Sequence, residues 1–223
     1  DAAGFAAATY LRGIDWVPVP TSLVGQVDAA IGGKTAIDLP QGKNLVGAFH
    51  WPTRTVIDAD LLHTLPERER QEGMAEVVKT SLLTGENLHD PLDVRRCAAF
   101  KAAVCLRDPH DHGERKQLNL GHTFAHALEA AAHYEGVTHG RAVALGLKAA
   151  LKLSGRDASA VDEILRPKPV RVDRERAWAA MQRDKKNVGG ELRLVLLGEN
   201  GPQWDVPVPA ADVRRALDEL IAG

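Results

Sequence analysis

N-L-G-H-T-F-A-H-A-L-E, the stretch from Asn119 to Glu129, is the most informative part of the sequence. It places His122 and His126 four residues apart, and on a helix such positions share one face with their side-chain roots about 5–6 Å apart. Two imidazoles held in this way can bind a metal together, or one can bind it while the other handles a proton. The motif alone fits equally well a partly buried helix with two hydrogen-bonded histidines.

A second segment, G-M-A-E-V-V-K from Gly73 to Lys79, favours the metal hypothesis. It places an acid, Glu76, and a base, Lys79, within an apolar run, whereas an ordinary surface ion pair would lie on a polar face. A carboxylate with two imidazoles is a common catalytic zinc set that leaves one coordination position open for substrate. A third histidine, His139, follows in T-H-G and would by itself indicate only the start of a helix.

Composition sets modest limits on function. The chain has 223 residues, enough for one or two domains. Its formal net charge of −2 provides no electrostatic basis for binding nucleic acid. The apolar runs are far shorter than the roughly 18 residues that a membrane span requires, and the first residues do not resemble a signal peptide. Cys97 and Cys105 are expected to be buried free thiols in a reducing cytoplasm.

The pattern along the chain changes from mixed α/β to helical. A helix is expected at Ala2–Leu11 before Gly13, followed by short strands at Ile14–Val19 and Arg54–Ile57. The helices expected thereafter are Glu67–Leu83, Val94–Arg107, Thr123–Tyr134, Arg141–Leu153 and Ala211–Ile221. Leu192–Leu197 and Gln203–Val206 flank Asn200-Gly201 and predict a late β-hairpin. We expect a domain boundary near Leu65–Glu67, with an active cleft between the two parts.

Polar residues gather in the front part, between Gly25 and Gly47. G-G-K-T, with Gly32, Gly33 and Lys34, could let backbone amides approach an anion. A nucleotide-triphosphate loop is excluded because the required first glycine would be Asp28. Together with Lys43 and Asn44, these residues suit a small hydroxylated anion better than a protein partner. A solvated turn with a surface lysine explains G-G-K-T alone as well.

In combination these segments resemble the 3-dehydroquinate synthase family of metal- and NAD-dependent cyclases. The matching text is A-A-A-T-Y-L-R-G from Ala6, P-T-S-L-V-G-Q-V-D-A-A-I-G-G-K-T from Pro20, G-K-N-L-V-G-A-F from Gly42, Thr64-Leu65-Pro66, the two motifs above, and Asp184-Lys185-Lys186. The resemblance implies that residues 1–66 are the remainder of a Rossmann-like NAD-binding α/β domain. Residues 67–223 would then form a mainly α-helical metal- and substrate-binding domain with the late hairpin.

The resemblance also implies roles for individual residues. Glu76, His122 and His139 would be the ligands of a zinc or cobalt ion. The catalytic residues would be Lys79, Lys34, Asn44, Asp28 and His126. Substrate would contact Lys101, Asn119, Arg115 and one of Lys185 and Lys186, and Arg12 would reach the phosphate site of a neighbouring subunit in a homodimer. NAD would contact Asp1, Thr21, Ser22, Asp28, Lys34, Lys43, Thr64 and Leu65.

The implied reaction converts 3-deoxy-D-arabino-heptulosonate 7-phosphate to 3-dehydroquinate and phosphate. It proceeds by transient oxidation with NAD, loss of phosphate, re-reduction and an intramolecular aldol closure, so that NAD is recycled. The partners expected are thus a phosphorylated sugar acid and a second subunit, with no nucleic acid and no membrane, in the cytoplasm.

Four departures from the family pattern bear on this interpretation. Ala125 replaces a usual glycine between the histidines, Arg141 replaces a frequent acid, and Ser154–Arg176 is short, so that a helix is expected to be trimmed. The segment that receives the NAD pyrophosphate should precede Asp1. We therefore expect the chain to be the later part of a longer protein, and a molecule that starts at Asp1 to bind NAD weakly and show little activity.

Three other functions remain open. The first is another sugar-phosphate cyclase, such as 2-deoxy-scyllo-inosose synthase or an amino-dehydroquinate synthase, although Arg115 and Lys101 favour a carboxylate-bearing substrate. The second is a metal-dependent polyol dehydrogenase, in which a phosphate ligand such as Arg12 would lack a purpose. The third is a non-catalytic metal-binding or dimerisation fragment.

Overall fold

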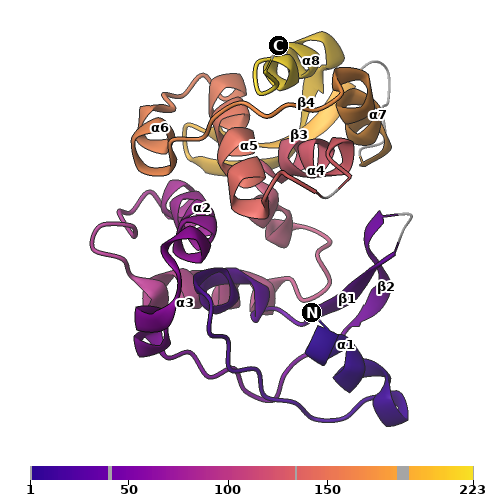
Figure 1. The fold of residues 1–223 in the computed structure, drawn as a ribbon, viewed down its shortest axis with the longest axis vertical. Helices are drawn as coiled ribbons and strands as arrows, with labels where there is room; N and C mark the ends of the chain where they lie inside the picture. The colour runs from indigo at the N-terminus through magenta and orange to yellow at the C-terminus, as the bar shows by residue number, and fades with distance from the viewer. Residues whose placement is uncertain (1, 40–41, 134, 185–190, 223) are drawn as a thin grey trace. The chain divides into compact units, whose positions relative to one another are not determined.

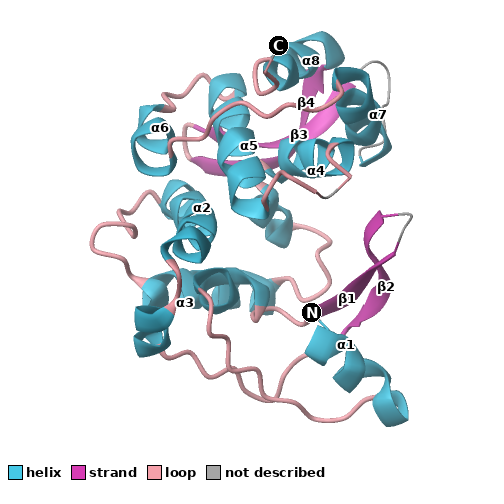
Figure 2. Cartoon of the chain, viewed as in Figure 1, coloured by secondary structure: helices cyan, strands magenta, loops and turns pink. Residues whose placement is uncertain are grey.

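The computed structural model describes residues 2–39, 42–133, 135–184 and 191–222, which form two compact units. Unit 1 comprises residues 1–73 and 88–115, and unit 2 comprises residues 74–87 and 116–223. Figure 1 labels the helices and strands of both units, and Figure 2 distinguishes helix, strand and loop. The boundary expected from the sequence, between residues 66 and 67, stays a prediction.

Unit 1 begins with helix α1 (Ala2–Thr9) and a 3₁₀ turn (Tyr10–Arg12) that ends at Gly13, with φ +121°, as the sequence predicts. A π-helical turn (Gly25–Ala29) lies against helix α3 (Val94–Arg107). A 3₁₀ turn spans Ala59–Thr64. Helix α2 (Glu67–Thr84) starts in unit 1 and continues into unit 2.

A β-hairpin occupies the glycine- and lysine-bearing stretch that the sequence interpretation left without regular structure. Strands β1 (Lys34–Leu39) and β2 (Gly42–Phe49) pair antiparallel, with Lys34 opposite Phe49. A Cβ added to Gly47 would lie 2.2 Å from the Thr35 carbonyl oxygen, so this position requires glycine for the close approach of the two strands. The hairpin therefore fixes Lys34 at its base.

The two strands predicted at Ile14–Val19 and Arg54–Ile57 are wrong. Neither segment is a strand in the structure, although Thr53 and Val56 donate backbone N–H groups to Trp16 and Pro18 carbonyls, each at 3.1 Å. Pro18, Pro20 and Pro52 have no N–H to donate, so that a regular ladder cannot form here.

Unit 2 packs helices against a hairpin. Helices α4 (His122–Ala131) and α5 (His139–Leu153) contact each other, and α5 also contacts α6 (Ser159–Leu165), α8 (Ala210–Asp218) and strand β3 (Glu191–Gly198). Helix α7 (Arg174–Asp184) packs on α4. The predicted late hairpin is confirmed: β3 pairs antiparallel with β4 (Gly201–Pro209), with Leu194 opposite Val206.

The core of unit 2 follows the periodicity of the sequence. Phe124 and Leu128 on α4 are buried, as are Val143, Leu147 and Leu151 on α5. Their spacing of three or four residues places each set on one face of its helix. Neither α6 nor α7 was expected; α6 lies within the segment in which a trimmed helix was predicted. Among the described residues, no helix combines the length and the apolar character that crossing a membrane requires.

Candidate metal centre and its surroundings

The acidic side of the candidate centre lies on α2. Glu76 and Lys79 belong to a buried stretch, with only 1% and 2% of their surface exposed, and Lys79 Nζ forms an ion pair with Glu76 Oε2. Burying two charged groups is tolerated when each has a partner. The apolar run around Glu76 therefore holds the carboxylate inside the unit, as the sequence predicts.

A close backbone contact positions His122. It is the first residue of α4 and follows Gly121, which has φ +77°. A Cβ added to Gly146 on α5 would lie 2.1 Å from the Gly121 carbonyl oxygen, so that only glycine lets α5 approach this turn. His122 Nδ1 lies 3.2 Å from the Leu120 carbonyl oxygen, and its Nε2 lies 3.3 Å from Glu76 Oε1.

His139 completes the set from the first position of α5. Its Nε2 lies 3.2 Å from Glu76 Oε1, and its Nδ1 lies 3.2 Å from Glu129 Oε1. One donor atom from each of Glu76, His122 and His139 lies within 4.8 Å of the other two. All three residues belong to unit 2.

The electrostatics of the centre are those of a carboxylate surrounded by cationic groups. Burial would raise the pKa of Glu76, but Lys79 and His122 outweigh it and hold this pKa well below its ordinary value. Burial lowers the pKa of His139, but hydrogen bonds to Glu129 and Glu76 outweigh it and raise the pKa to about 9. The centre therefore favours an ionised Glu76 facing positive charge.

The donor set fits a zinc or cobalt ion. Donors about 2.1 Å from a tetrahedral ion are about 3.4 Å from one another, close to the 3.2 Å and 3.3 Å that separate Glu76 Oε1 from the two Nε2 atoms. Both Nδ1 atoms face oxygen acceptors, so that Nδ1 can keep its proton in each ring while Nε2, which faces Glu76 Oε1, would exchange its proton for the metal. One carboxylate and two imidazoles are ligands that both metals accept.

His126, the second histidine of the motif, does not belong to this donor set. Its ring centroid lies 5.7 Å from that of His122 in an edge-on arrangement, and its side chain is exposed. Asn119 ends a 3₁₀ turn (Glu114–Asn119) three residues before His122 and is half-buried. Both residues are thus close in the chain to His122 of the candidate donor set.

A second polar cluster lies in unit 1. Lys101 on α3 forms an ion pair with Asp28, with 2.7 Å between Nζ and Oδ1, and its ammonium also donates to the Asp28 carbonyl oxygen at 2.7 Å. Lys34 forms an ion pair with Asp111. Asp28, Lys34 and Lys101 are therefore held by salt bridges within unit 1.

Arg115 is buried, and its guanidinium binds main-chain carbonyl groups. It is 2% exposed, and its guanidinium donates to the carbonyl oxygens of Pro109 at 3.0 Å and Gly32 at 2.7 Å. The Arg115 guanidinium also lies over the Phe49 ring, 5.8 Å from its centroid. In this structure the side chain connects the G-G-K-T turn to the 108–115 loop, and its contact with a substrate anion stays a prediction.

The remaining candidates lie on turns and loops of unit 1. Arg12 and Asn44 are exposed and have positive φ values of 69° and 54°. Gln26 Nε2 donates to the carbonyl oxygens of Pro20 at 3.1 Å and Asp58 at 2.7 Å, which connects the turn carrying Thr21 and Ser22 to the turn carrying Thr64 and Leu65. Asp1, Lys185, Lys186 and the Lys43 side chain lie outside the part of the chain that the structure describes.

Sequence reasoning missed two acidic residues that contact the predicted site residues. Glu129 contacts His139. Its position seven residues after His122 places it on the same helical face as that residue, but does not indicate a contact with His139. Asp111 pairs with Lys34. No local pattern distinguishes Asp111 from its neighbours His110 and His112, which are exposed.

The departures from the family pattern are accommodated locally. Ala125 is fully buried on α4, so that its methyl group packs in the core. Arg141 donates to the carbonyl oxygens of Lys168 and Pro169, at 2.9 to 3.1 Å. Its guanidinium therefore ties α5 to the segment that precedes α7.

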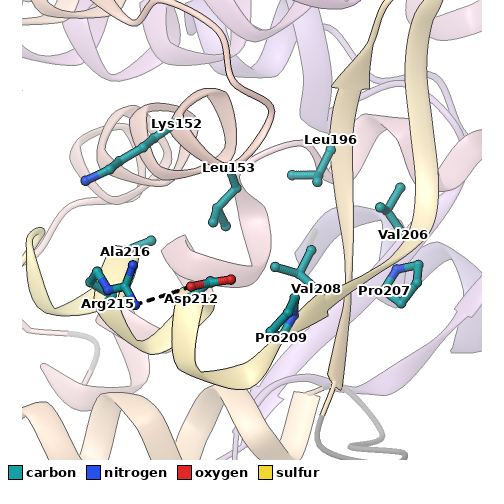
Figure 3. A pocket seen from close by; sticks show the side chains of 10 residues that line it. All are labelled: Lys152, Leu153, Leu196, Val206, Pro207, Val208, Pro209, Asp212, Arg215 and Ala216. Atoms are coloured by element: carbon teal, nitrogen blue, oxygen red, sulfur yellow. Dashed lines mark ion pairs between the residues drawn. The ribbon is translucent and has the colours of Figure 1, made fainter.

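A hollow of about 460 Å³ lies elsewhere in unit 2 (Figure 3). Its floor is apolar, with Leu153, Leu196 and Val208, and its rim carries Asp212 and Arg215, whose side chains form an ion pair at 3.4 Å. None of the predicted site residues lines this hollow. It therefore gives no support to a ligand site separate from the histidine cluster.

The comparison of the chain with family models and its comparison with known proteins give the same result. Residues 1–72 match the N-terminal domain of 3-dehydroquinate synthase, and residues 73–187 match the C-terminal domain. A 3-dehydroquinate synthase from Salinibacter ruber is 43% identical over 97% of this chain and 67% of its own length. One from Xanthomonas axonopodis pv. citri is 40% identical over 100% of this chain and 69% of its own length.

Solved structures of sugar-phosphate cyclases share the fold. A 2-deoxy-scyllo-inosose synthase in complex with carbaglucose-6-phosphate, NAD⁺ and Co²⁺ superposes with a TM-score of 0.87 at 27% identity, over 97% of this chain and 70% of that one. A 2-epi-5-epi-valiolone synthase from Streptomyces hygroscopicus with NAD⁺ and Zn²⁺ bound gives 0.82 at 25% identity, over 98% and 69%. The two 3-dehydroquinate synthases are more similar to this chain in sequence than the two cyclases of solved structure are, and both family models describe the same group. The chain belongs to the 3-dehydroquinate synthase family.

Proposed function

We propose that the protein converts 3-deoxy-D-arabino-heptulosonate 7-phosphate to 3-dehydroquinate and phosphate. The observation that carries this proposal is the convergence of Glu76, His122 and His139, three residues far apart in the sequence, on one point of unit 2. The membership of the chain in the 3-dehydroquinate synthase family supports the choice of reaction. The proposed class is a carbon–oxygen lyase that depends on NAD and a divalent metal.

Two groups would supply chemistry that the side chains lack. Glu76, His122 and His139 would hold Zn²⁺ or Co²⁺, and Thr21, Ser22, Asp28, Lys34, Lys43, Thr64 and Leu65 would contact NAD. When bound, the metal polarises substrate oxygens, and NAD accepts a hydride and later returns it. The structures of two related cyclases with NAD⁺ and Co²⁺ or Zn²⁺ support this assignment.

Residues of unit 2 would manage charge and protons near the metal. Lys79 is buried against Glu76, and its fixed positive charge would stabilise negative charge that develops on a substrate oxygen. His126 is exposed beside His122, where an imidazole can take up or release a proton near neutral pH. Asn119 would orient a hydroxyl group of the substrate by hydrogen bonding.

Cationic residues of unit 1 would recognise the anionic groups of the substrate. Lys34 and Lys101 are each paired with an aspartate, Asp111 and Asp28, so that a carboxylate or phosphate would join or replace that partner. Arg12 is exposed, as a residue that reaches a second subunit must be, and this supports the proposal of a homodimer. We also propose that residues 1–66 are the remainder of a Rossmann-like domain and that the enzyme is cytoplasmic.

A phosphate-release assay tests the proposal. The full-length protein is incubated with NAD, Zn²⁺ and the heptulosonate 7-phosphate, and phosphate is measured with a coupled enzyme. We expect phosphate release that a chelator abolishes and Zn²⁺ or Co²⁺ restores, and a lower turnover in His126→Ala. An absence of release in the metal- and NAD-loaded protein would reject the assignment.

The high structural similarity to 2-deoxy-scyllo-inosose synthase favours one second candidate, a cyclase that acts on glucose 6-phosphate. The same assay separates the two reactions, because glucose 6-phosphate carries no carboxylate for Lys34 or Lys101 to bind. We expect no phosphate from glucose 6-phosphate. Release from this sugar alone would select the second candidate.

A further inference from the structure

Glu129 is a buried carboxylate for which the proposed reaction supplies no role. It lies on α4 with 2% of its surface exposed. Carboxylates are rarely buried so completely. The helix ends two residues later, at Ala131, and a negative charge near a helix C-terminus opposes the helix dipole. A carboxylate so buried needs a hydrogen-bond partner inside the protein.

His139 is one such partner. Glu129 Oε1 lies 3.2 Å from His139 Nδ1, and the other ring nitrogen, Nε2, lies 3.2 Å from Glu76 Oε1. An imidazole that offers the Nε2 lone pair to a metal must carry its proton on Nδ1. A carboxylate at Nδ1 accepts that proton in a hydrogen bond, which fixes the tautomer and the orientation of the ring.

The second histidine ligand shows the same arrangement with a different acceptor. His122 Nδ1 faces the Leu120 carbonyl oxygen at 3.2 Å, a backbone group that can only accept a hydrogen bond. In both rings Nδ1 therefore faces an oxygen acceptor, from the main chain for His122 and from a side chain for His139, although the ring planes are inclined at 65°. His122 and Glu129 are seven residues apart, so that one face of α4 carries both a ligand and the acceptor for the other histidine.

We propose that Glu129 is a positioning residue: it holds His139 with Nδ1 protonated and Nε2 directed at the divalent cation. This inference rests on the proposed function, in which Glu76, His122 and His139 bind that cation. Because all four residues lie in unit 2, the chain as it stands is suitable for the test.

The test measures zinc affinity by competition with a chromophoric chelator. Removing such an outer acceptor typically weakens metal binding by about 10- to 100-fold, and we expect this loss in Glu129→Ala. Glu129→Gln should lose less, because its amide oxygen can still accept from Nδ1. Glu135→Gln serves as the control, since it removes the same charge from an exposed position in unit 2 and should leave affinity unchanged.

A double-mutant cycle separates positioning from general destabilisation. In a His139→Ala background, Glu129→Ala should cause no further loss of affinity, whereas a residue that only supports the fold would still weaken binding. The ¹⁵N spectrum of the zinc-loaded wild type should show His139 protonated at Nδ1, and Glu129→Gln should alter the shift of that nitrogen.

The outcomes distinguish this inference from the proposed function. If the wild type binds zinc and Glu76→Gln abolishes binding, but Glu129→Ala and Glu129→Gln bind as the wild type does, the positioning role is overturned and the metal centre stands. If the wild type does not bind zinc, both fall. A His139 protonated at Nε2 in the zinc-loaded chain would also overturn the inference.

Discussion

At the scale of single residues, the two oxygens of Glu76 have different surroundings. Oε1 faces His122 and His139, and Oε2 faces Lys79. The carboxylate therefore has a cationic partner even when no metal is bound, which explains how so buried an acid is compatible with folding.

Lys79→Met tests this balance. Removing one partner of a buried ion pair costs about 3–5 kcal/mol, because the remaining charge stays buried. We expect the metal-free variant to unfold at a clearly lower urea concentration than the wild type, and added zinc to recover part of the difference by neutralising Glu76. Lys148→Met is the control, since the side chains of its pair with Asp162 are 32% and 49% exposed, and such a solvent-accessible pair should contribute about 1 kcal/mol or less. Equal effects of the two substitutions would contradict the account.

Of the three proposed ligands, Glu76 and His122 were predictable at this scale, because Glu76 stands in an apolar run and His122 in a pair of histidines at helical spacing. His139 by itself indicated only a helix start, and its role as a ligand was implied by the family resemblance. Glu129 was not predictable as a partner of His139, because their contact depends on how α4 packs against α5 and not on the sequence near either residue. The ion pair between Lys34 and Asp111 was hidden for the same reason, since 77 residues separate its members.

At the scale of elements, the contact between α4 and α5 determines where the histidines lie. In Gly146→Ala the added Cβ would lie 2.1 Å from the Gly121 carbonyl oxygen, so that the helices must separate. We expect a loss of stability of about 1–3 kcal/mol, and weaker zinc binding, because His122 directly follows Gly121. Gly113→Ala is the control, since its added methyl group would meet only the Asp108 carboxylate, at 3.9 Å. Zinc affinity unchanged in Gly146→Ala would show that this contact does not position the ligand.

The 108–115 loop of unit 1 is organised by Asp108. Its carboxylate accepts backbone N–H groups from His112 at 3.0 Å, Gly113 at 2.7 Å and Arg115 at 3.0 Å. Desolvation would raise the pKa of Asp108, but these hydrogen bonds outweigh it and lower the pKa to about 2. The ionised carboxylate therefore stabilises the loop that also carries Asp111 and Arg115.

This lowered pKa predicts how stability depends on pH. In the unfolded chain an aspartate has a pKa of about 3.9, so that Asp108 contributes stability above about pH 4 and loses it progressively as the pH falls to about 2. The difference in urea midpoint between the wild type and Asp108→Asn should be largest near neutral pH and shrink across this window. A difference that stays constant from pH 6 to pH 2 would contradict the prediction.

The regular elements differed in how far the sequence could predict them. Helices with a clear apolar face were predicted closely, and Val94–Arg107 matches α3 in full. The β1–β2 hairpin was missed because its glycines and lysines resemble a loop, and its pairing is set by contacts across the turn. The extended segments 14–19 and 54–57 have strand-like composition, but their prolines prevent a ladder.

At the scale of the whole molecule, the two units differ in how well their apolar residues are covered. Ile14, Val17, Val19 and Val56 in unit 1 are 40% to 55% exposed. Backbone hydrogen bonds connect the segment that carries Ile14, Val17 and Val19 to the segment that carries Val56, so that these side chains contribute to one region of unit 1. Exposed apolar groups that lie together are uncommon on a protein surface.

An apolar dye should therefore bind unit 1. We expect the native chain to enhance the fluorescence of anilinonaphthalene sulfonate, and the double substitution Val17→Lys with Val19→Lys to reduce it. Zinc affinity should not change in this variant, because the proposed ligands all belong to unit 2. Dye binding that is absent in the wild type, or equal in the two proteins, would contradict the prediction.

The central claim is that Glu76, His122 and His139 bind one divalent cation. X-ray absorption at the zinc edge of the zinc-loaded chain, together with metal analysis, tests it directly. The account predicts one zinc per chain, with two imidazole nitrogens and one carboxylate oxygen at about 2.0–2.2 Å, loss of the ion in Glu76→Gln, and weaker binding with one imidazole nitrogen fewer in His139→Ala. Zinc that remains bound with the same spectrum in both variants, or a chain that binds none, would contradict it.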